Sequence, residues 1–343
     1  MKNLLVTGGC GFIGSNFVRL VINELPSVNL INLDKLTYAG NLENLADIKS
    51  GRHYTFIKGD ICDKALVAKV LVSHKIDTIV NFAAESHVDR SILGPEDFIT
   101  TNVYGTHVLI ELSRKIWSKD GFAGKKFLQI STDEVYGSLG KTGKFKENTP
   151  LTPSSPYSSS KASADLIVRS YFSTYGYPAL ISRCSNNYGP FQFPEKFIPL
   201  MIVRALNNEP LPVYGDGKNI RDWLHVMDHC KAILAILEKG RLGEVYNIGG
   251  VNEWRNIDIA KLILKKLGEP GSLIKFVKDR PGHDRRYAMD ASKIIRELGW
   301  KPGHDFESGL DETLEWYRAH SDWWKSVMSG EYRTHYKKWY AER

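Results

Sequence analysis

Apolar and polar residues follow one another along the first half of the chain in blocks that predict strands and helices in turn. Strand-like apolar runs occupy residues 3–7, 28–33, 53–57, 78–82, 126–130 and 179–182, and segments with helical periodicity occupy residues 12–25, 63–75, 97–117 and 158–175. Because strands that alternate with helices build βαβ units, the pattern predicts an α/β fold with a doubly wound parallel sheet of the Rossmann type.

The pattern changes near residue 185, where turn-rich stretches at 186–190 and 214–217 separate short elements. We therefore expect a first domain at residues 1–184 and a smaller, mixed α/β C-terminal lobe that takes up most of residues 185–343. Residues 244–248 form one more strand-like run, so a segment of about 222–250 is expected to return to the first sheet. The aromatic, charged stretch after Trp316 predicts a surface helix that packs on the body of the protein.

Composition and charge narrow the classes of function. Of the 343 residues, 42% are hydrophobic and 25% are charged, and the formal net charge of +7 favours anionic partners. Basic residues are interspersed with acidic ones and form no run or zinc-finger pattern, which argues against nucleic acid as a partner. No apolar run approaches the length of a membrane span, and the first residues lack the features of a secretory signal, so we expect a cytoplasmic protein.

The cysteines are too widely spaced to indicate a metal site or a disulfide framework. No two of them form a Cys-x-x-Cys pair, and no histidine stands near them at metal-ligand spacing. We interpret all four as reduced thiols and expect no bound metal: Cys10, Cys62, Cys184 and Cys230.

A glycine turn between the first strand and the first helix is the candidate cofactor site. Gly8, Gly11 and Gly14 surround Phe12 and Ile13 at the start of the predicted helix. Residues without a Cβ let the backbone approach a pyrophosphate, and a helix N-terminus offers free N–H groups and a positive dipole end. A plain tight turn would leave the same glycine pattern, so the interpretation depends on what surrounds it.

Acidic residues after the second and third strands favour NAD. Asp34 lies 20 residues past Gly14, where a carboxylate accepts hydrogen bonds from the adenine ribose and repels a 2′-phosphate. Lys35 weakens this prediction, because a lysine can pair with such a phosphate. Asp60 and Ile61 follow the third strand and would face the adenine, although a simple loop explains them equally well.

Tyr157 and Lys161 are candidates for a catalytic pair. Four residues apart on a predicted helix, they share one face, so the ammonium could lie near the phenol oxygen. A free tyrosine titrates near pH 10, and a neighbouring cation is expected to lower that pKa. Ser131 and Thr132, just past the fifth strand, are the candidate hydroxyl partners of the reacting alcohol.

Asp133 and Glu134 add a chemistry that simple redox transfer does not need. Once a sugar hydroxyl at C4 is oxidised to a ketone, the C5 proton becomes acidic, and a base and an acid can expel water across C5 and C6. Glu134 would be the base, and Asp133 would be an acid kept protonated by burial or by its acidic neighbour. An acidic cap at a helix N-terminus is the structural alternative.

These motifs together resemble the extended short-chain dehydrogenase/reductase family, and within it the dTDP-glucose 4,6-dehydratases. The resemblance covers the chain from Met1 to about Tyr317 and is carried by residues 8–14, 83–91, 132–137, 157–161, 183–190, 221–226 and 279–287. It implies conversion of dTDP-glucose to the 4-keto-6-deoxy sugar nucleotide by internal hydride transfer through bound NAD, with Thr132 as the hydroxyl partner. The product would serve deoxysugar synthesis, for example as a rhamnose precursor.

The resemblance also implies further site residues and a homodimer formed by helices of the cofactor domain. Ala83, Ala84 and Asn186 would lie on the cofactor. Two phosphates call for cations, and Lys196, Arg221 and Arg280 are the candidates. The other implied substrate contacts are Ser86, His87, Asn187, Glu195, Pro212, Tyr214, Asn256, His283 and Tyr287. The alternatives are a 4-epimerase or a dehydratase for another nucleotide sugar, and, more distantly, a non-catalytic NAD-sensing module.

Overall fold

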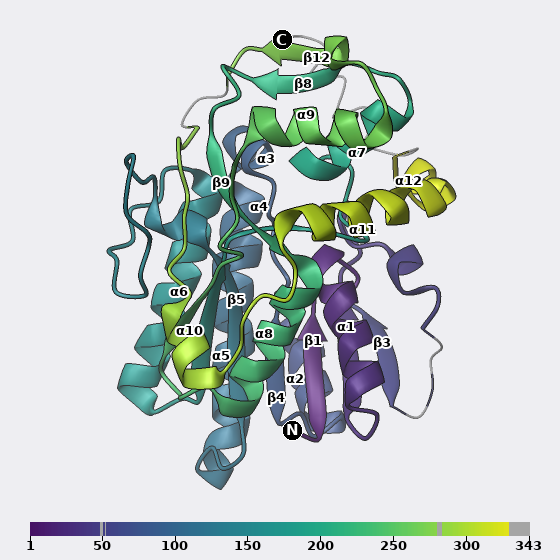
Figure 1. The fold of residues 1–343 in the computed structure, drawn as a ribbon. Coiled ribbons are helices and arrows are strands. Elements are labelled where there is room, and N and C mark those ends of the chain that lie inside the picture. Colours follow the sequence, from purple (N-terminus) through teal and green to yellow (C-terminus); the bar gives the residue numbers. More distant parts are fainter. Residues whose placement is uncertain (49–50, 52, 280–282, 329–343) are drawn as a thin grey trace.

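Seven parallel strands form the central sheet of the protein. The computed structural model describes residues 1–48, 51, 53–279 and 283–328, and orders the strands β10-β6-β5-β4-β1-β2-β3 (Figure 1). The strands are largely buried apolar runs, as expected where helices cover both faces. Their bounds are β1 (Asn3–Thr7), β2 (Asn29–Asp34), β3 (Tyr54–Lys58), β4 (Thr78–Asn81), β5 (Lys126–Thr132), β6 (Ala179–Cys184) and β10 (Val245–Ile248). The predicted doubly wound fold is confirmed.

Helices cover both faces of this sheet and bury two separate cores. On one face, α1 (Phe12–Glu24), α8 (Val226–Lys239) and α10 (Ser292–Leu298) pack on the strands around Phe17, Ile233 and Ile294. On the other face lie α2 (Lys64–Ser73), α5 (Thr106–Trp117) and α6 (Pro156–Tyr175), with Val67, Leu109 and Val168 in the core. The shorter elements are η1 (Leu42–Leu45), α3 (Val88–Leu93), η3 (Ser118–Asp120) and η4 (Asp133–Tyr136).

The segment predicted as one helix at 97–117 is divided. It begins as α4 (Glu96–Phe98), continues as the π-helical segment η2 (Ile99–Gly105) and becomes regular only in α5. Apolar periodicity detects that such a segment is helical, but it does not report a wider turn. The ends of the remaining predicted strands and helices of this half differ from the structure by one or two residues.

A smaller lobe follows β6 and stands over the carboxyl ends of the sheet strands (Figure 1). It contains a three-stranded sheet, β11-β9-β7, and a two-stranded parallel sheet, β12-β8. The chain returns to the large sheet in between, since β10 pairs with β6. The elements of the lobe are β7 (Asn186–Tyr188), α7 (Phe197–Leu206), β8 (Leu211–Tyr214), β9 (Ile220–His225), β11 (Glu253–Arg255), α9 (Asn256–Leu267), η5 (Gly271–Leu273), β12 (Ile274–Val277) and α11 (Phe306–Ala319).

The last described helix, α12 (Ser321–Met328), joins the C-terminal lobe to the cofactor side of the large domain. Trp324 is buried, and Trp323 donates its indole N–H to Asn44 Oδ1 on η1 at 2.9 Å. Up to residue 328, the stretch after Trp316 is therefore helical and packs on the body of the protein, as predicted. The prediction for residues 329–343 falls outside the described residues. Among the described helices, none combines the length and the apolar character that crossing a membrane requires.

Candidate active site

A pocket lies along the carboxyl ends of β1 to β6, where loops of a doubly wound sheet gather. The structure brings together in its lining all the residues predicted to bind the cofactor and all those predicted to be catalytic. The first group comprises Gly8, Gly11, Phe12, Ile13, Gly14, Asp34, Lys35, Asp60, Ile61, Ala83, Ala84 and Asn186, and the second Thr132, Asp133, Glu134, Tyr157 and Lys161. The structure shows that these residues line one pocket, and the role of each residue remains a prediction.

The three glycines of the turn have different structural tasks. Gly8 has a φ of +70°, and a Cβ there would lie 2.7 Å from the Ala83 backbone nitrogen. A Cβ on Gly14 would lie 2.2 Å from the Gly8 carbonyl oxygen, so both positions require glycine for close packing. A Cβ on Gly11 would meet nothing nearer than that same oxygen, at 3.3 Å. Gly11 also begins α1 without a side-chain cap, which leaves the helix N-terminus open toward the pocket.

The acidic residue at the end of β2 is anchored by the backbone of the glycine turn. Asp34 accepts the backbone N–H of Cys10 at 2.9 Å and that of Leu36 at 2.8 Å, and burial raises the pKa of its carboxyl. Lys35 lies 2.8 Å from Asp60, and this hydrogen bond raises the pKa of the lysine. The cation that could have received a 2′-phosphate is thus already paired with a carboxylate.

Tyr157, at the start of α6, is buried next to the end of β5. Burial, followed by the negative charge of Glu134, raises the pKa of the phenol well above its ordinary value, and a hydrogen bond with Thr132 opposes the shift. The Thr132 hydroxyl also accepts the backbone N–H of Glu134 at 3.2 Å. Of the two hydroxyl candidates, Thr132 is therefore the one in contact with the phenol, while the buried Ser131 hydroxyl has no hydrogen-bond partner within the described chain.

The expected effect of Lys161 on Tyr157 is wrong for the protein by itself. We expected the ammonium to lower the pKa of the phenol, yet that pKa is raised. Lys161 donates its ammonium to the Ile130 carbonyl at 2.6 Å, and burial lowers its own pKa. The spacing on α6 suggested that the Lys161 ammonium would lie near the Tyr157 oxygen. In the structure the ammonium is instead hydrogen-bonded to the backbone at the end of β5.

Asp133 is a buried carboxyl whose surroundings favour the protonated form. Burial, then the charges of Glu134 and Asp222, raise its pKa well above the ordinary value. Its Oδ1 accepts the Thr132 hydroxyl at 3.2 Å, whereas its Oδ2 is buried without a hydrogen-bond partner in the described chain. A protonated carboxyl with one oxygen uncommitted at a pocket wall can act as an acid toward a bound molecule.

Four of the predicted substrate contacts line the same pocket: Ser86, Asn187, Glu195 and Lys196. Lys196 donates to the Ser86 carbonyl at 3.0 Å, and Asn187 Oδ1 accepts from His229 Nδ1 at 2.9 Å. Glu195 is buried, and burial raises its pKa. His87 contacts it at 3.7 Å from just outside the lining.

The remaining predicted substrate contacts do not line this pocket. They form a second group in the C-terminal lobe: Pro212, Tyr214, Arg221, Asn256, His283 and Tyr287. Arg221 lies over the Tyr287 ring at 4.2 Å and donates to the Asp284 carbonyl at 2.9 Å, and the Tyr214 ring meets the His283 ring edge-on. The prediction for Arg280 falls outside the described residues.

Comparison with known proteins places the chain in a family. Residues 5–313 match the family model described as GDP-mannose 4,6 dehydratase. The chain is 53% identical to a dTDP-glucose 4,6-dehydratase of Xanthomonas campestris pv. campestris (strain B100), with 97% of this chain and 98% of the relative covered. It is 50% identical to one from Escherichia coli, with 96% and 97% covered. The chain belongs to the dTDP-glucose 4,6-dehydratase family.

Solved structures agree with this family. A dTDP-glucose 4,6-dehydratase from Bacillus anthracis in complex with NAD is 50% identical, with a TM-score of 0.88 over 95% of this chain and all of the other. One from Streptomyces venezuelae with NAD bound is 47% identical, with a TM-score of 0.90 over the same shares. A UDP-glucose 4-epimerase from Thermotoga maritima is 30% identical, with a TM-score of 0.84 over 93% and 99%. Among these proteins, the dehydratases are the more similar in sequence.

The pocket of this dehydratase family member includes residues that the sequence analysis did not single out. They lie on three loops and at the end of β6: Thr37, Ala39, Gly40, Glu85, Cys184, Ser185, Gln192 and Phe193. For 37–40 a signal existed, because the segment directly follows the predicted Asp34 and a Cβ on Gly40 would lie 2.7 Å from Asp34 Oδ1. Gln192 and Phe193 stand in an irregular loop, where no periodic pattern indicates which side chains face inward.

Proposed function

We propose that this chain converts dTDP-glucose to dTDP-4-keto-6-deoxyglucose, a hydro-lyase reaction in which hydride is removed from the sugar and returned to it. The observation that carries the proposal is the buried Asp133, whose pKa is raised by its burial and by the neighbouring Glu134, in the pocket that also holds Tyr157. Oxidation alone needs no such pair, whereas elimination of water needs an acid and a base on neighbouring carbon atoms.

The residues of the glycine turn fit NAD. The open Gly11 position and the uncapped N-terminus of α1 suit a pyrophosphate, and Asp34 suits the ribose hydroxyls. The Lys35–Asp60 pair removes the cation that a 2′-phosphate would need. NAD, when bound, supplies the place where the sugar hydride is held between oxidation and reduction.

Tyr157 and Thr132 act on the C4 hydroxyl. Tyr157, as the phenolate, accepts the hydroxyl proton while Thr132, in contact with it, holds the alcohol oxygen in place. Since burial raises the pKa of Tyr157, phenolate formation needs a positive charge brought close to it, which Lys161 provides only in part because its ammonium is bound to the Ile130 carbonyl. We therefore propose that Tyr157 becomes a base only in the loaded site.

Glu134 and Asp133 carry out the elimination. Glu134 removes the proton from C5, which the C4 ketone has made acidic, and the Asp133 carboxyl donates its proton to the leaving C6 hydroxyl. The fold favours this division of roles, because Asp133 is almost fully buried and its proton is further held by the charge of Glu134. Each group is expected to contribute about 10²- to 10⁴-fold to the rate.

We assign the two groups of substrate contacts to two parts of one molecule. The sugar would lie in the main pocket near Glu195 and Lys196, and the nucleotide would extend toward Arg221, Tyr287 and Tyr214 in the C-terminal lobe. In this proposal residues 1–184, with 222–250, hold NAD and most of 185–343 hold the sugar nucleotide. The thymine preference rests on the names of the relatives, and a panel of nucleotide-linked glucoses would test it.

Incubation of the purified chain with dTDP-glucose, first without and then with added NAD, tests the main proposal. We expect a 4-keto product, detected by its absorbance in alkali, and no net change in NAD. The same assay with Tyr157→Phe should give almost no product. A wild-type protein that epimerises the sugar at C4 without losing water would contradict the proposal.

We also propose a cytoplasmic homodimer that serves deoxysugar synthesis. The four cysteines are free thiols, which suits a reducing compartment. Large apolar side chains are exposed on the packed segments η2 and α6: Ile99, Tyr104, Leu166, Phe172 and Tyr175. Burial of such a patch between two copies would remove it from water. Sedimentation velocity should show a dimer that Leu166→Glu dissociates and that Phe276→Glu, changed at an exposed position on β12 of the C-terminal lobe, leaves intact.

A further inference from the structure

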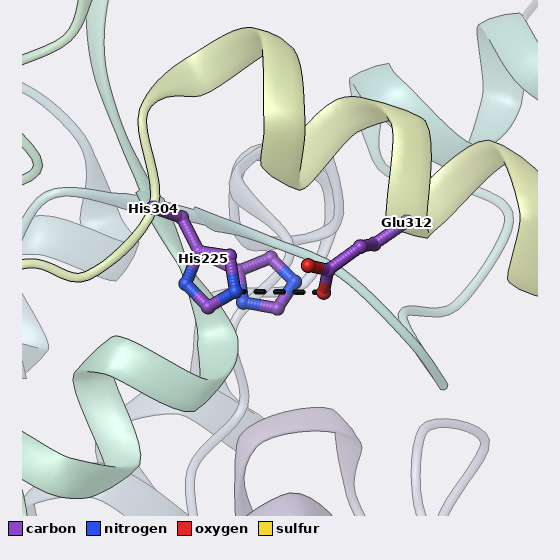
Figure 2. Close-up of side chains that lie close together, drawn as sticks. All are labelled: His225, His304 and Glu312. Carbon is purple, nitrogen blue, oxygen red and sulfur yellow. Dashed lines mark ion pairs between the residues drawn. The ribbon is translucent and has the colours of Figure 1, made fainter.

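Two imidazoles and a carboxylate meet at the junction between β9 and the C-terminal segment, away from the pocket. His225 ends β9, His304 precedes α11, and Glu312 lies on α11. One ligand atom of each lies within 4.8 Å of the others, and His304 Nε2 is 3.4 Å from Glu312 Oε2. Figure 2 shows the three side chains directed toward one another from three segments.

We propose that His225, His304 and Glu312 bind a divalent first-row transition metal ion, with Zn²⁺ as the best match. Tetrahedral Zn²⁺ with ligands at about 2.0 to 2.1 Å places neighbouring ligand atoms about 3.3 Å apart. The 3.4 Å between His304 and Glu312 already has this spacing. Glu312 is 60% exposed at its side chain, so water can complete the coordination. Two imidazoles with one carboxylate form a donor set that suits Zn²⁺ better than Mg²⁺ or Ca²⁺.

Asp228 orients His304 as the outer carboxylates of metal sites orient their histidines. The buried Asp228 Oδ2 accepts the His304 backbone N–H at 2.9 Å and faces His304 Nδ1 at 3.0 Å. With its proton on Nδ1, the imidazole presents the Nε2 lone pair toward Glu312. Two acceptors at this distance repel each other unless a second proton or a cation lies between them.

The surroundings of His225 also indicate a bound ligand. His225 is only 3% exposed, and neither ring nitrogen has a hydrogen-bond partner in the described part of the chain. Buried polar groups without partners are uncommon, and a bound ion would satisfy this one.

The ion would fasten α11 to the end of β9. The three residues belong to segments separated by 79 and 8 positions, so the ion would close a loop that includes the return strand β10. This dispersion is also why the sequence analysis expected no metal: none of the spacings matches a local ligand motif. None of the three residues lines the main pocket, so the metal site does not depend on the proposed reaction.

Binding of Zn²⁺ to the tag-free, EDTA-treated full chain tests the proposal by calorimetry and by elemental analysis after dialysis. We expect about one Zn²⁺ per chain, a Zn²⁺-dependent rise in Tm, and an intense visible spectrum when Co²⁺ takes its place. Glu312→Gln and His304→Asn should each weaken the affinity by about tenfold or more. Glu315→Gln, an exposed change on the same helix, is the matched control and should bind as the wild type does.

Three outcomes would overturn the proposal. A wild-type chain that retains no Zn²⁺ would show that His304 and Glu312 form only an ion pair. Equal affinity in wild type and Glu312→Gln would place the metal on other histidines of the surface. If Glu315→Gln lowered the Zn²⁺ affinity as much as Glu312→Gln does, any loss of negative charge on α11 would be enough to weaken binding. Each readout is independent of dehydration activity, so failure here and failure of the proposed reaction can be told apart.

Discussion

Asp133 and Glu134 are neighbours in the chain, but only Asp133 is almost fully buried. If Glu134 removes the C5 proton, Glu134→Gln should leave oxidation at C4 intact and stop the reaction before water leaves. We expect turnover to fall by about 10²- to 10⁴-fold while reduced nicotinamide accumulates at about 340 nm. Unchanged turnover in this variant would remove Glu134 from the mechanism.

At neutral pH the buried Asp133 is expected to lower the free energy of unfolding, although the proposed reaction needs it. Folding raises its pKa, so its favourable contribution is complete below the unfolded-state pKa of about 3.9 and is lost as pH rises through the folded-state value. Asp133→Asn has no such titration and should therefore gain stability relative to wild type as pH rises, while losing most of its activity. Denaturant unfolding of both proteins at several pH values measures this; parallel curves would contradict the expectation.

For single residues, the sequence was enough to predict where the candidate reacting groups lie, but not the direction in which their pKa values shift. Tyr157 and Lys161 were placed correctly because i and i+4 share a helix face. The direction of the Tyr157 pKa shift was wrong, because the spacing revealed neither the burial of the phenol nor the charge of Glu134 beside it. The pKa depends on burial and on atoms that come from other strands, and neither is visible in a local motif.

Among the elements, the turn between β1 and α1 separates two kinds of glycine. Gly14→Ala should destabilise the apo-protein, because its Cβ would collide with the Gly8 carbonyl. Gly11→Ala should fold with nearly unchanged Tm but bind NAD more weakly, because its Cβ would meet little except the bound pyrophosphate. Thermal unfolding and NAD titration of the apo-proteins distinguish the two. Equal losses of Tm would show that Gly11 is also a packing residue.

The parallel elements and the residues at their carboxyl ends were predictable because their topology is restrictive. Once strands alternate with helices, the ends of β1 to β6 must meet at one edge of the sheet, and this places Asp34, Ala83 and Thr132 together. The contacts of the C-terminal lobe are different, because Arg221 and Tyr287 come from a short strand and a loop whose positions depend on tertiary packing. Residue type and motif indicated these side chains, but no periodicity indicated their relative positions.

At the scale of the whole molecule, α12 connects the C-terminal lobe with the cofactor site. The Trp323 indole donates to Asn44 Oδ1, and the Asn44 amide donates to the Cys10 carbonyl at 2.8 Å, inside the glycine turn. Trp323→Ala should lower the free energy of unfolding by about 1 to 3 kcal/mol and speed the release of NAD. Trp323→Phe keeps the aromatic packing and should retain most of the stability. Stopped-flow release and denaturant unfolding would check both, and unaltered NAD release in Trp323→Ala would disconnect α12 from the cofactor.

The contact between Trp323 and Asn44 joins residues 279 positions apart. The glycine turn is synthesised long before Trp323, so the large sheet can begin to fold before this contact exists. If the contact supports the cofactor site as predicted, a chain that ends before α12 should form the sheet but release NAD faster than one that includes α12.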